Sequence, residues 1–170
     1  MRLSPATVAA ERDWVRDRTA VVRLINGVRS DLGAAFGVEV APVSEADYRA
    51  EVDAVFADGD LAVNVAALVA LLRDLDVEDD YPGFVVDELL GRELAGMIAG
   101  SQPLRLLGEA TFHYADVTHH PEGETAPGGG EHEPSEPAGV DDLEAALAAG
   151  FQTRLPGWDW TEGDSPFAVE

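Results

Sequence analysis

Apolar residues recur at helical spacing through the first 36 positions of the chain. Ser4 and Pro5 form a helix-start pair, because a capping hydroxyl precedes the residue whose fixed backbone angle suits the first helical position. The apolar side chains that follow fall three, four or seven residues apart and form one stripe, which comprises Val8, Val15, Val22, Ile25, Val28, Leu32 and Phe36. The stripe predicts a single helix of about eight turns, weakened at Gly27 and ending near Gly33 or Gly37.

Three further helices are expected before residue 101. They are predicted over residues 45–58, 61–75 and 84–100. Ser44 and Asp47 form a capping-box-like start for the first of them, and Asp60 is expected to cap the second. Residues 61–75 are apolar on nearly every face, so this should be the most buried helix. The short connections favour an antiparallel bundle of about four helices.

Alternation replaces the helical pattern in the second half of the chain. Residues 109–118 place Ala110, Phe112 and Tyr114 at every second position, which predicts a strand. A second strand over residues 151–155 would pair with the first. The remaining short elements are a strand-like stretch at 38–43 and a short helix at 143–149, capped by Asp141 or Asp142.

These elements predict an α+β fold: a mainly helical bundle with a small antiparallel sheet from the C-terminal half, a long flexible loop and an extended C-terminal arm. Residues 1–120 would form a helical domain that runs into a strand. Residues 121–139 are a low-complexity acidic loop rich in glycine and proline, whose composition cannot build a core. Residues 140–170 would supply a short helix, a strand and the arm, packed on or beyond the same domain.

Thirty-three acidic residues, eleven arginines and no lysine give the chain a net charge of −22. Hydrated carboxylates keep a protein soluble where salt screens its self-repulsion to about 3 Å. We therefore expect a halophilic protein from a high-salt organism or its virus, with an acidic protein of a GC-rich bacterium as the alternative. Free nucleic acid is a poor partner, because the surface repels phosphate and molar salt removes the counterion-release term.

Several classes of site and location are excluded or disfavoured by composition. The chain has no cysteine, so disulfides and thiol chemistry are excluded. The strongest apolar run, residues 61–72, is too short to cross a membrane, and the first residues do not have the order of a signal peptide. We expect the cytoplasm of a high-salt host, or a virion, as the location.

Positive charge is concentrated at the amino end. Residues 1–29 hold six arginines and three acids, whereas the other 141 residues hold five arginines and thirty acids. The candidate interface cations are Arg12, Arg16, Arg18, Arg23 and Arg29. They either pair with acids of their own chain or bind carboxylates of a neighbouring subunit, which guanidinium groups do bidentately.

The C-terminal arm carries large aromatic side chains, and we count Trp158, Trp160 and Phe167 as candidate interface residues. Residues two apart in an extended segment point to opposite faces, so one tryptophan can pack on the parent domain while the other faces outward. The arm therefore either holds a neighbouring subunit, where tryptophan is a frequent anchor, or folds back on its own bundle.

All four histidines lie within twenty residues: His113, His119, His120 and His132. Imidazoles and nearby carboxylates are competent ligands for a divalent transition metal. No pair of these histidines has the i, i+4 spacing of a helical metal site, so solvated histidines beside a loop are the alternative.

Catalytic motifs are absent from the sequence, and no other cofactor is indicated. Acidic pairs such as Asp87 with Glu88 could act as general acid and base, but such pairs are expected by chance in so acidic a chain.

The sequence is best explained by a non-enzymatic structural subunit of a larger assembly, such as a viral head-tail connector, adaptor or tail-completion protein. Its partners would be copies of itself or neighbouring subunits, and no membrane is expected to take part. A small metal-binding accessory protein built on the histidines is one alternative. An enzyme with an unrecognised acidic site is another.

Overall fold

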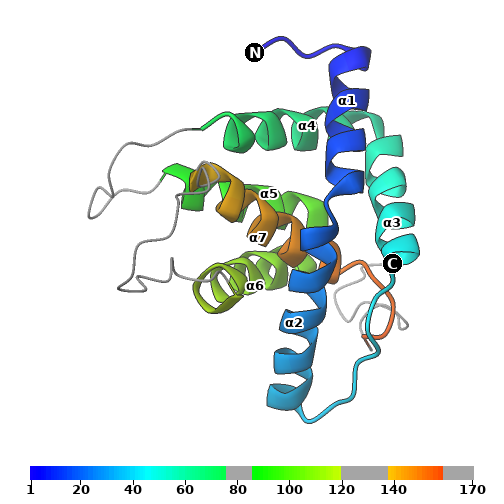
Figure 1. Cartoon of the computed structure of the whole chain (residues 1–170), viewed down its shortest axis with the longest axis vertical. Helices are drawn as coiled ribbons and strands as arrows, with labels where there is room; N and C mark the ends of the chain where they lie inside the picture. Colours follow the sequence, from blue (N-terminus) through cyan, green and yellow to red (C-terminus); the bar gives the residue numbers. More distant parts are fainter. Residues whose placement is uncertain (76–85, 120–137, 159–170) are drawn as a thin grey trace, which may run out of the picture.

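The computed structural model describes residues 1–75, 86–119 and 138–158, and every regular element within those ranges is a helix (Figure 1). The helices are α1 (Pro5–Asp17), α2 (Thr19–Phe36), α3 (Glu45–Ala57), α4 (Gly59–Arg73), α5 (Val86–Ala99), α6 (Leu104–His119) and α7 (Ala138–Gln152). Helices α1 and α2 follow one another down the long axis of the molecule, whereas α5, α6 and α7 are stacked beside them (Figure 1). Most of the expected loop at 121–139 and the arm beyond Trp158 lie outside the described residues.

The predicted sheet is wrong, since the described residues contain no strand. Residues 109–118 lie within α6, where Ala110 is exposed and Phe112 and Ala115 are buried three residues apart. The alternation therefore did not mark two faces, and helical spacing separates core from solvent instead. Residues 151–155 are the end of α7 and a turn, in which the Leu155 N–H donates to the Phe151 carbonyl at 3.1 Å.

The predicted long N-terminal helix is in fact two helices, separated at Arg18, whose backbone angles are φ −77° and ψ 87°. Helix α1 packs on α3 and α4, whereas α2 packs chiefly on α6 and α7. The break allows the two halves of one apolar stripe to bury against different partners. The expected ends are confirmed, because Ser4 caps α1 with Thr7 in a capping box and Gly37 ends α2 at φ 69°.

Local sequence signals predicted the start of α3 correctly and placed the cap of α4 two residues too late. The Ser44 hydroxyl accepts from the Asp47 N–H at 3.2 Å, and the Asp47 carboxylate accepts from the Ser44 N–H, which confirms the predicted capping box. Helix α4 is capped by Asp58, not by Asp60 as expected, and Asp58 is also the C-cap of α3. One residue thus forms the corner between two helices that are bent by 112°.

Helix α7 is the centre of the core, although only a short helix was expected there. It contacts α2 to α6, and its residues 142–152 are all buried. Its core residues are Val140, Leu143, Ala145, Ala146, Leu147, Ala148, Ala149 and Phe151. Helix α4, which was expected to be the most buried, instead leaves Val63 and Leu71 exposed. Asp141 lies in the first turn of α7 and Asp142 follows it inside the helix, so neither residue is its cap.

Glycines allow α7 and α6 to approach α5 closely. A Cβ atom added at Gly150 of α7 would lie 2.7 Å from the Ile98 Cβ atom and 3.0 Å from the Ala95 carbonyl oxygen. At Gly108 of α6 it would lie 3.0 Å from the same oxygen. Because backbone cannot move aside as a flexible side chain can, these two positions require hydrogen as the side chain.

Among the described residues, no single helix is long and apolar enough to cross a membrane. Helices α3 and α4 pass that test only as a pair bent by 112°.

We expect Gly150→Ala to lower the free energy of unfolding by about 1–3 kcal/mol, because the added methyl group overpacks the contact between α7 and α5. Gly59→Ala is the matched control, since a Cβ atom there meets nothing within 4 Å. It should be neutral or slightly stabilising. Urea denaturation in molar salt measures both, and equal effects of the two substitutions would contradict the packing described for α7.

Candidate protein-interaction surface

An apolar groove lies between the start of α1, the end of α3 and the start of α4. Its volume is about 500 Å³, and its main lining residues are Leu3, Pro5, Val8, Phe56, Val63 and Arg12. Leu3 and Val63 are each 41% exposed. The groove therefore gathers large apolar side chains at the surface of a strongly acidic chain.

The corner at Asp58 creates this groove. Because α3 and α4 diverge there by 112° and α1 packs on both, the first two turns of α1 stand over the corner without filling it. Val15, further along the same stripe of α1, is fully buried, whereas Val8 is only partly buried. The apolar stripe of α1 thus belongs to the core at one end and to the groove at the other.

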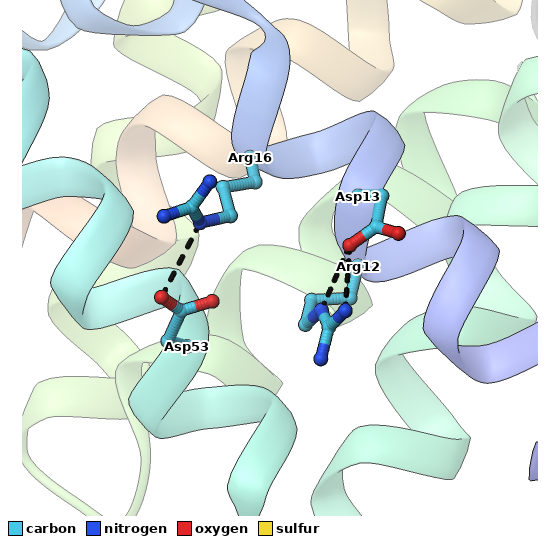
Figure 2. A network of polar contacts seen from close by, with 4 residues as sticks. All are labelled: Arg12, Asp13, Arg16 and Asp53. Carbon is cyan, nitrogen blue, oxygen red and sulfur yellow. Dashed lines mark hydrogen bonds and ion pairs between the residues drawn. The ribbon is translucent and has the colours of Figure 1, made fainter.

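Charged side chains continue the groove along α1 and α3 (Figure 2). The Arg12 Nε and Nη2 atoms donate to one Asp13 carboxylate oxygen at 3.0 and 2.7 Å. The Arg16 Nε atom reaches across to Asp53 of α3 at 3.3 Å. A second hollow of about 420 Å³ lies among these four residues and shares Arg12 and Phe56 with the apolar groove.

The other N-terminal arginines differ in their surroundings. Arg18 lies 3.2 Å from Glu144 of α7 and 4.4 Å from the centre of the Trp14 ring. Arg12, Arg16 and Arg18 therefore pair with acids of their own chain, as one of the two interpretations expected. Arg23 is exposed on α2, and no ion pair to it occurs in the described part of the chain.

Arg29 is buried, with only 2% of its surface exposed, and no carboxylate pairs with it among the described residues. Its guanidinium group donates to three backbone carbonyls, those of Ala41 at 3.0 Å, Pro156 at 2.9 Å and Leu155 at 3.2 Å. Burial lowers the pKa of Arg29 to about 10. The side chain thereby ties α2 to the α2–α3 connection and to the residues that follow α7.

Trp158 completes this contact. It is 2% exposed, its ring meets the Phe36 ring edge-on at 6.5 Å, and the Arg29 guanidinium carbon lies 5.6 Å from its centre. The chain therefore folds back on its own bundle as far as Trp158. Of the predicted interface aromatics, Trp160 and Phe167 lie outside the described residues.

Three aspartates from three helices form a cluster that the sequence did not indicate. Asp142 of α7 shares side-chain hydrogen bonds with Asp87 of α5 and Asp116 of α6. Burial, together with the charges of Asp116 and Asp87, raises the pKa of Asp142 to about 8. Asp142 therefore keeps its proton at neutral pH, which allows the three carboxyl groups to lie together.

The predicted metal ligands are only partly described. His113 is exposed on α6 and His119 is the last residue of that helix, whereas His120 and His132 lie outside the described residues. In the parts of the chain that the structure describes, no group of three histidine or acidic side chains could hold a metal ion.

Comparison with known proteins assigns a family. The family model described as a domain of unknown function, DUF7984, matches residues 1–170. The chain belongs to the DUF7984 family. No curated protein and no solved structure matches it.

Sequence reasoning about this DUF7984 chain missed the groove and the aspartate cluster for different reasons. Leu3, Pro5 and Val8 carry the groove, but the periodicity of α1 assigned Val8 to the core stripe. The sequence pattern makes Asp141 or Asp142 a helix cap, since an aspartate before an apolar run is a common start signal. Only the partners of α1 and α7 reveal what these residues do.

We expect Arg29→Met to lower the free energy of unfolding by about 1–3 kcal/mol, because it leaves three carbonyl groups without their shared donor. Arg12→Met is the matched control, and it should leave stability nearly unchanged because Arg12 pairs with Asp13 only at the surface. Thermal and urea denaturation in molar salt measure both. If Arg29→Met were as stable as the unchanged chain, the buried guanidinium group would not stabilise the contact between α2 and the residues that follow α7.

Asp142 should make stability depend on pH. Its pKa is 3.8 in the unfolded chain and about 8 in the folded one, so the folded state binds more protons between these values. The free energy of unfolding therefore falls as pH rises from about 4 to about 8, by at most about 1.4 kcal/mol per pH unit, and then levels off.

Asp142→Asn should remove that contribution and make the protein more stable than the unchanged chain at pH 8 and above. Asp141→Asn, at the exposed neighbouring position, is the control. Urea denaturation over a series of pH values gives the free energy of unfolding of each variant as a function of pH. If this dependence were the same for Asp142→Asn and the unchanged chain, Asp142 would not be its source.

Proposed function

We propose that this DUF7984 protein is a non-enzymatic subunit of a larger assembly in a high-salt organism, and that a protein partner binds in the groove of α1, α3 and α4. One observation carries the proposal. Large apolar side chains, among them Leu3, Val8 and Val63, gather in a groove on a chain whose net charge is −22. An apolar concavity on so charged a surface is typical of a site for another molecule.

The physics of concentrated salt supports an apolar interface. Molar salt screens charges beyond about 3 Å, so attraction between charged surfaces is weak there. Burial of apolar surface is not screened, and salting-out ions strengthen it. A halophilic subunit is therefore expected to hold its neighbour through apolar contacts and to use charged groups for solubility.

Arg12 and Arg16 fit the margin of such an interface better than its centre. Each is about 41% exposed as a side chain and already pairs with an aspartate of its own chain. They can offer further donors to a partner's carboxylate at short range. Arg29 and Trp158 are occupied within their own chain and have no part in the proposed surface.

The partner would be another copy of the chain or a neighbouring subunit, in the cytoplasm of the host or in a virion. A viral head-tail connector, adaptor or tail-completion protein is one form of assembly that the proposal covers. The absence of catalytic motifs from the sequence supports a structural role over an enzymatic one.

We expect the protein to form a species larger than a monomer in molar salt, and Val63→Asp to shift it towards the monomer by burying a carboxylate in the contact. Leu106→Asp is the matched control, since Leu106 is 62% exposed on α6, away from the groove. Size-exclusion chromatography with light scattering measures the mass, and circular dichroism confirms that each variant folds. A monomer at every concentration, in the presence of its assembly partners as well, would refute the proposal.

A further inference from the structure

The groove has a defined chemistry, and its occupant must match it. The apolar part is lined by Leu3, Val8 and Val63, and the Arg12 side chain lies at its border with the polar hollow. Asp13 accepts from the Nε and Nη2 atoms of Arg12, and no acceptor for Nη1 occurs among the described residues. A suitable occupant therefore combines a few large apolar side chains with carboxylates beside them.

The twelve residues that follow Trp158 have this composition. Residues 159–170 hold four acids, Asp159, Glu162, Asp164 and Glu170, and no basic residue. The apolar run Phe167-Ala168-Val169 follows Asp164 closely. The apolar run thus matches the apolar lining of the groove, and a carboxylate close to it matches Arg12 at the border.

We propose that residues 159–170 of one copy bind in the groove of a second copy, with Phe167 and Val169 in the apolar part and Asp164 near Arg12. This inference rests on the proposed function and names the partner. It gives one role to two features that the sequence analysis singled out, the arginines near the amino end, of which α1 carries Arg12 and Arg16, and the aromatic residues of the C-terminal arm.

Chain length favours a second copy over the same copy. Trp158 is held by Arg29 and Phe36 of α2, whereas the groove lies at Val8, near the start of α1. Helices α1 and α2 follow one another along the long axis (Figure 1), and a rise of 1.5 Å per residue, if the two were collinear, would put Val8 about 30–40 Å from those two residues.

A fully extended segment from residue 159 to Phe167 covers only about 30 Å. It would have to run straight, whereas the route from Trp158 to the groove follows the curved surface of the bundle. The groove of the same chain is therefore close to the limit of its reach, whereas a neighbouring copy can place its groove beside residue 158. Each copy then offers one segment and one groove, so reciprocal exchange closes a dimer and exchange in one direction closes a ring.

Engineered cysteines test the contact directly, because the chain has none of its own. One full-length sample carries Val63→Cys and the other carries Ala168→Cys, which keeps Phe167 in place. Mixed in molar salt under mild oxidation, they should form a disulfide-linked pair of chains at least tenfold more readily than a mixture of Leu106→Cys with Ala168→Cys. Mass spectrometry of the linked peptides identifies the two positions.

A second measurement does not depend on cysteine chemistry. Phe167→Asp should weaken self-association about tenfold to a hundredfold, as loss of a buried aromatic side chain does. Phe167→Leu keeps an apolar side chain and should retain most of the affinity. Light scattering over a concentration series gives the dissociation constants.

Three other outcomes would contradict, in turn, the exchange between copies, the choice of occupant and the proposed function. A disulfide that forms within single chains of the double variant Val63→Cys, Ala168→Cys, and not between chains, would show that a chain fills its own groove. Association that persists without the link and is unaffected by Phe167→Asp would refute this occupant but leave the proposed function standing. A monomer under all conditions, alone and with assembly partners, would refute both.

Discussion

The burial of α7 on every side is the constraint on which the rest of the structure depends. A helix with no solvent face must be covered all round, and α2, α4, α5 and α6 supply most of that cover. Alanine and glycine along α7 allow the neighbouring helices to come close, most tightly where Gly150 meets Ala95 and Ile98. Because backbone is in contact there, the positions of α5 and α6 are set with little tolerance. The N-terminal helices then arrange themselves around the outside of this centre.

Two charged residues that this arrangement carries inward are accommodated in different ways. Arg29 keeps its charge, and its Nη1 and Nη2 atoms donate to backbone carbonyls, so that the side chain joins α2 to the two connections beside it. Asp142 instead keeps its proton, which allows it to hydrogen-bond to Asp87 and Asp116 without three negative charges in one place. Arg29 joins α2 to the residues that follow α7. The Asp142 cluster joins the starts of α5 and α7 to the last turn of α6. Neither site belongs to the groove of α1, α3 and α4, where we propose that a partner binds.

Several elements followed from short sequence signals because the physics that forms them is local. Ser4 with Thr7 and Ser44 with Asp47 cap their helices through hydrogen bonds between residues three apart, and Gly37 ends α2 because glycine tolerates a positive φ. The predicted strands failed because alternation over a few residues does not distinguish a strand from a helix. Ala110, Phe112 and Tyr114 alternate in sequence, but α6 buries Phe112 and Ala115 and exposes Ala110. The break at Arg18 had no local signal, because it results from the different partners of α1 and α2.

By itself, the sequence determined the charge of the surface, the absence of cysteine chemistry and the ends of several helices. Each of these depends on composition or on residues close together in the chain. Only the tertiary structure decided that α7 is central, that Val8 lines a groove while Val15 is core, and that Arg29 and Trp158 face inward. Those outcomes depend on which helices meet, and the free energy of such contacts comes from surfaces distant in sequence. A pattern along one helix shows that a face will be covered, but not by what.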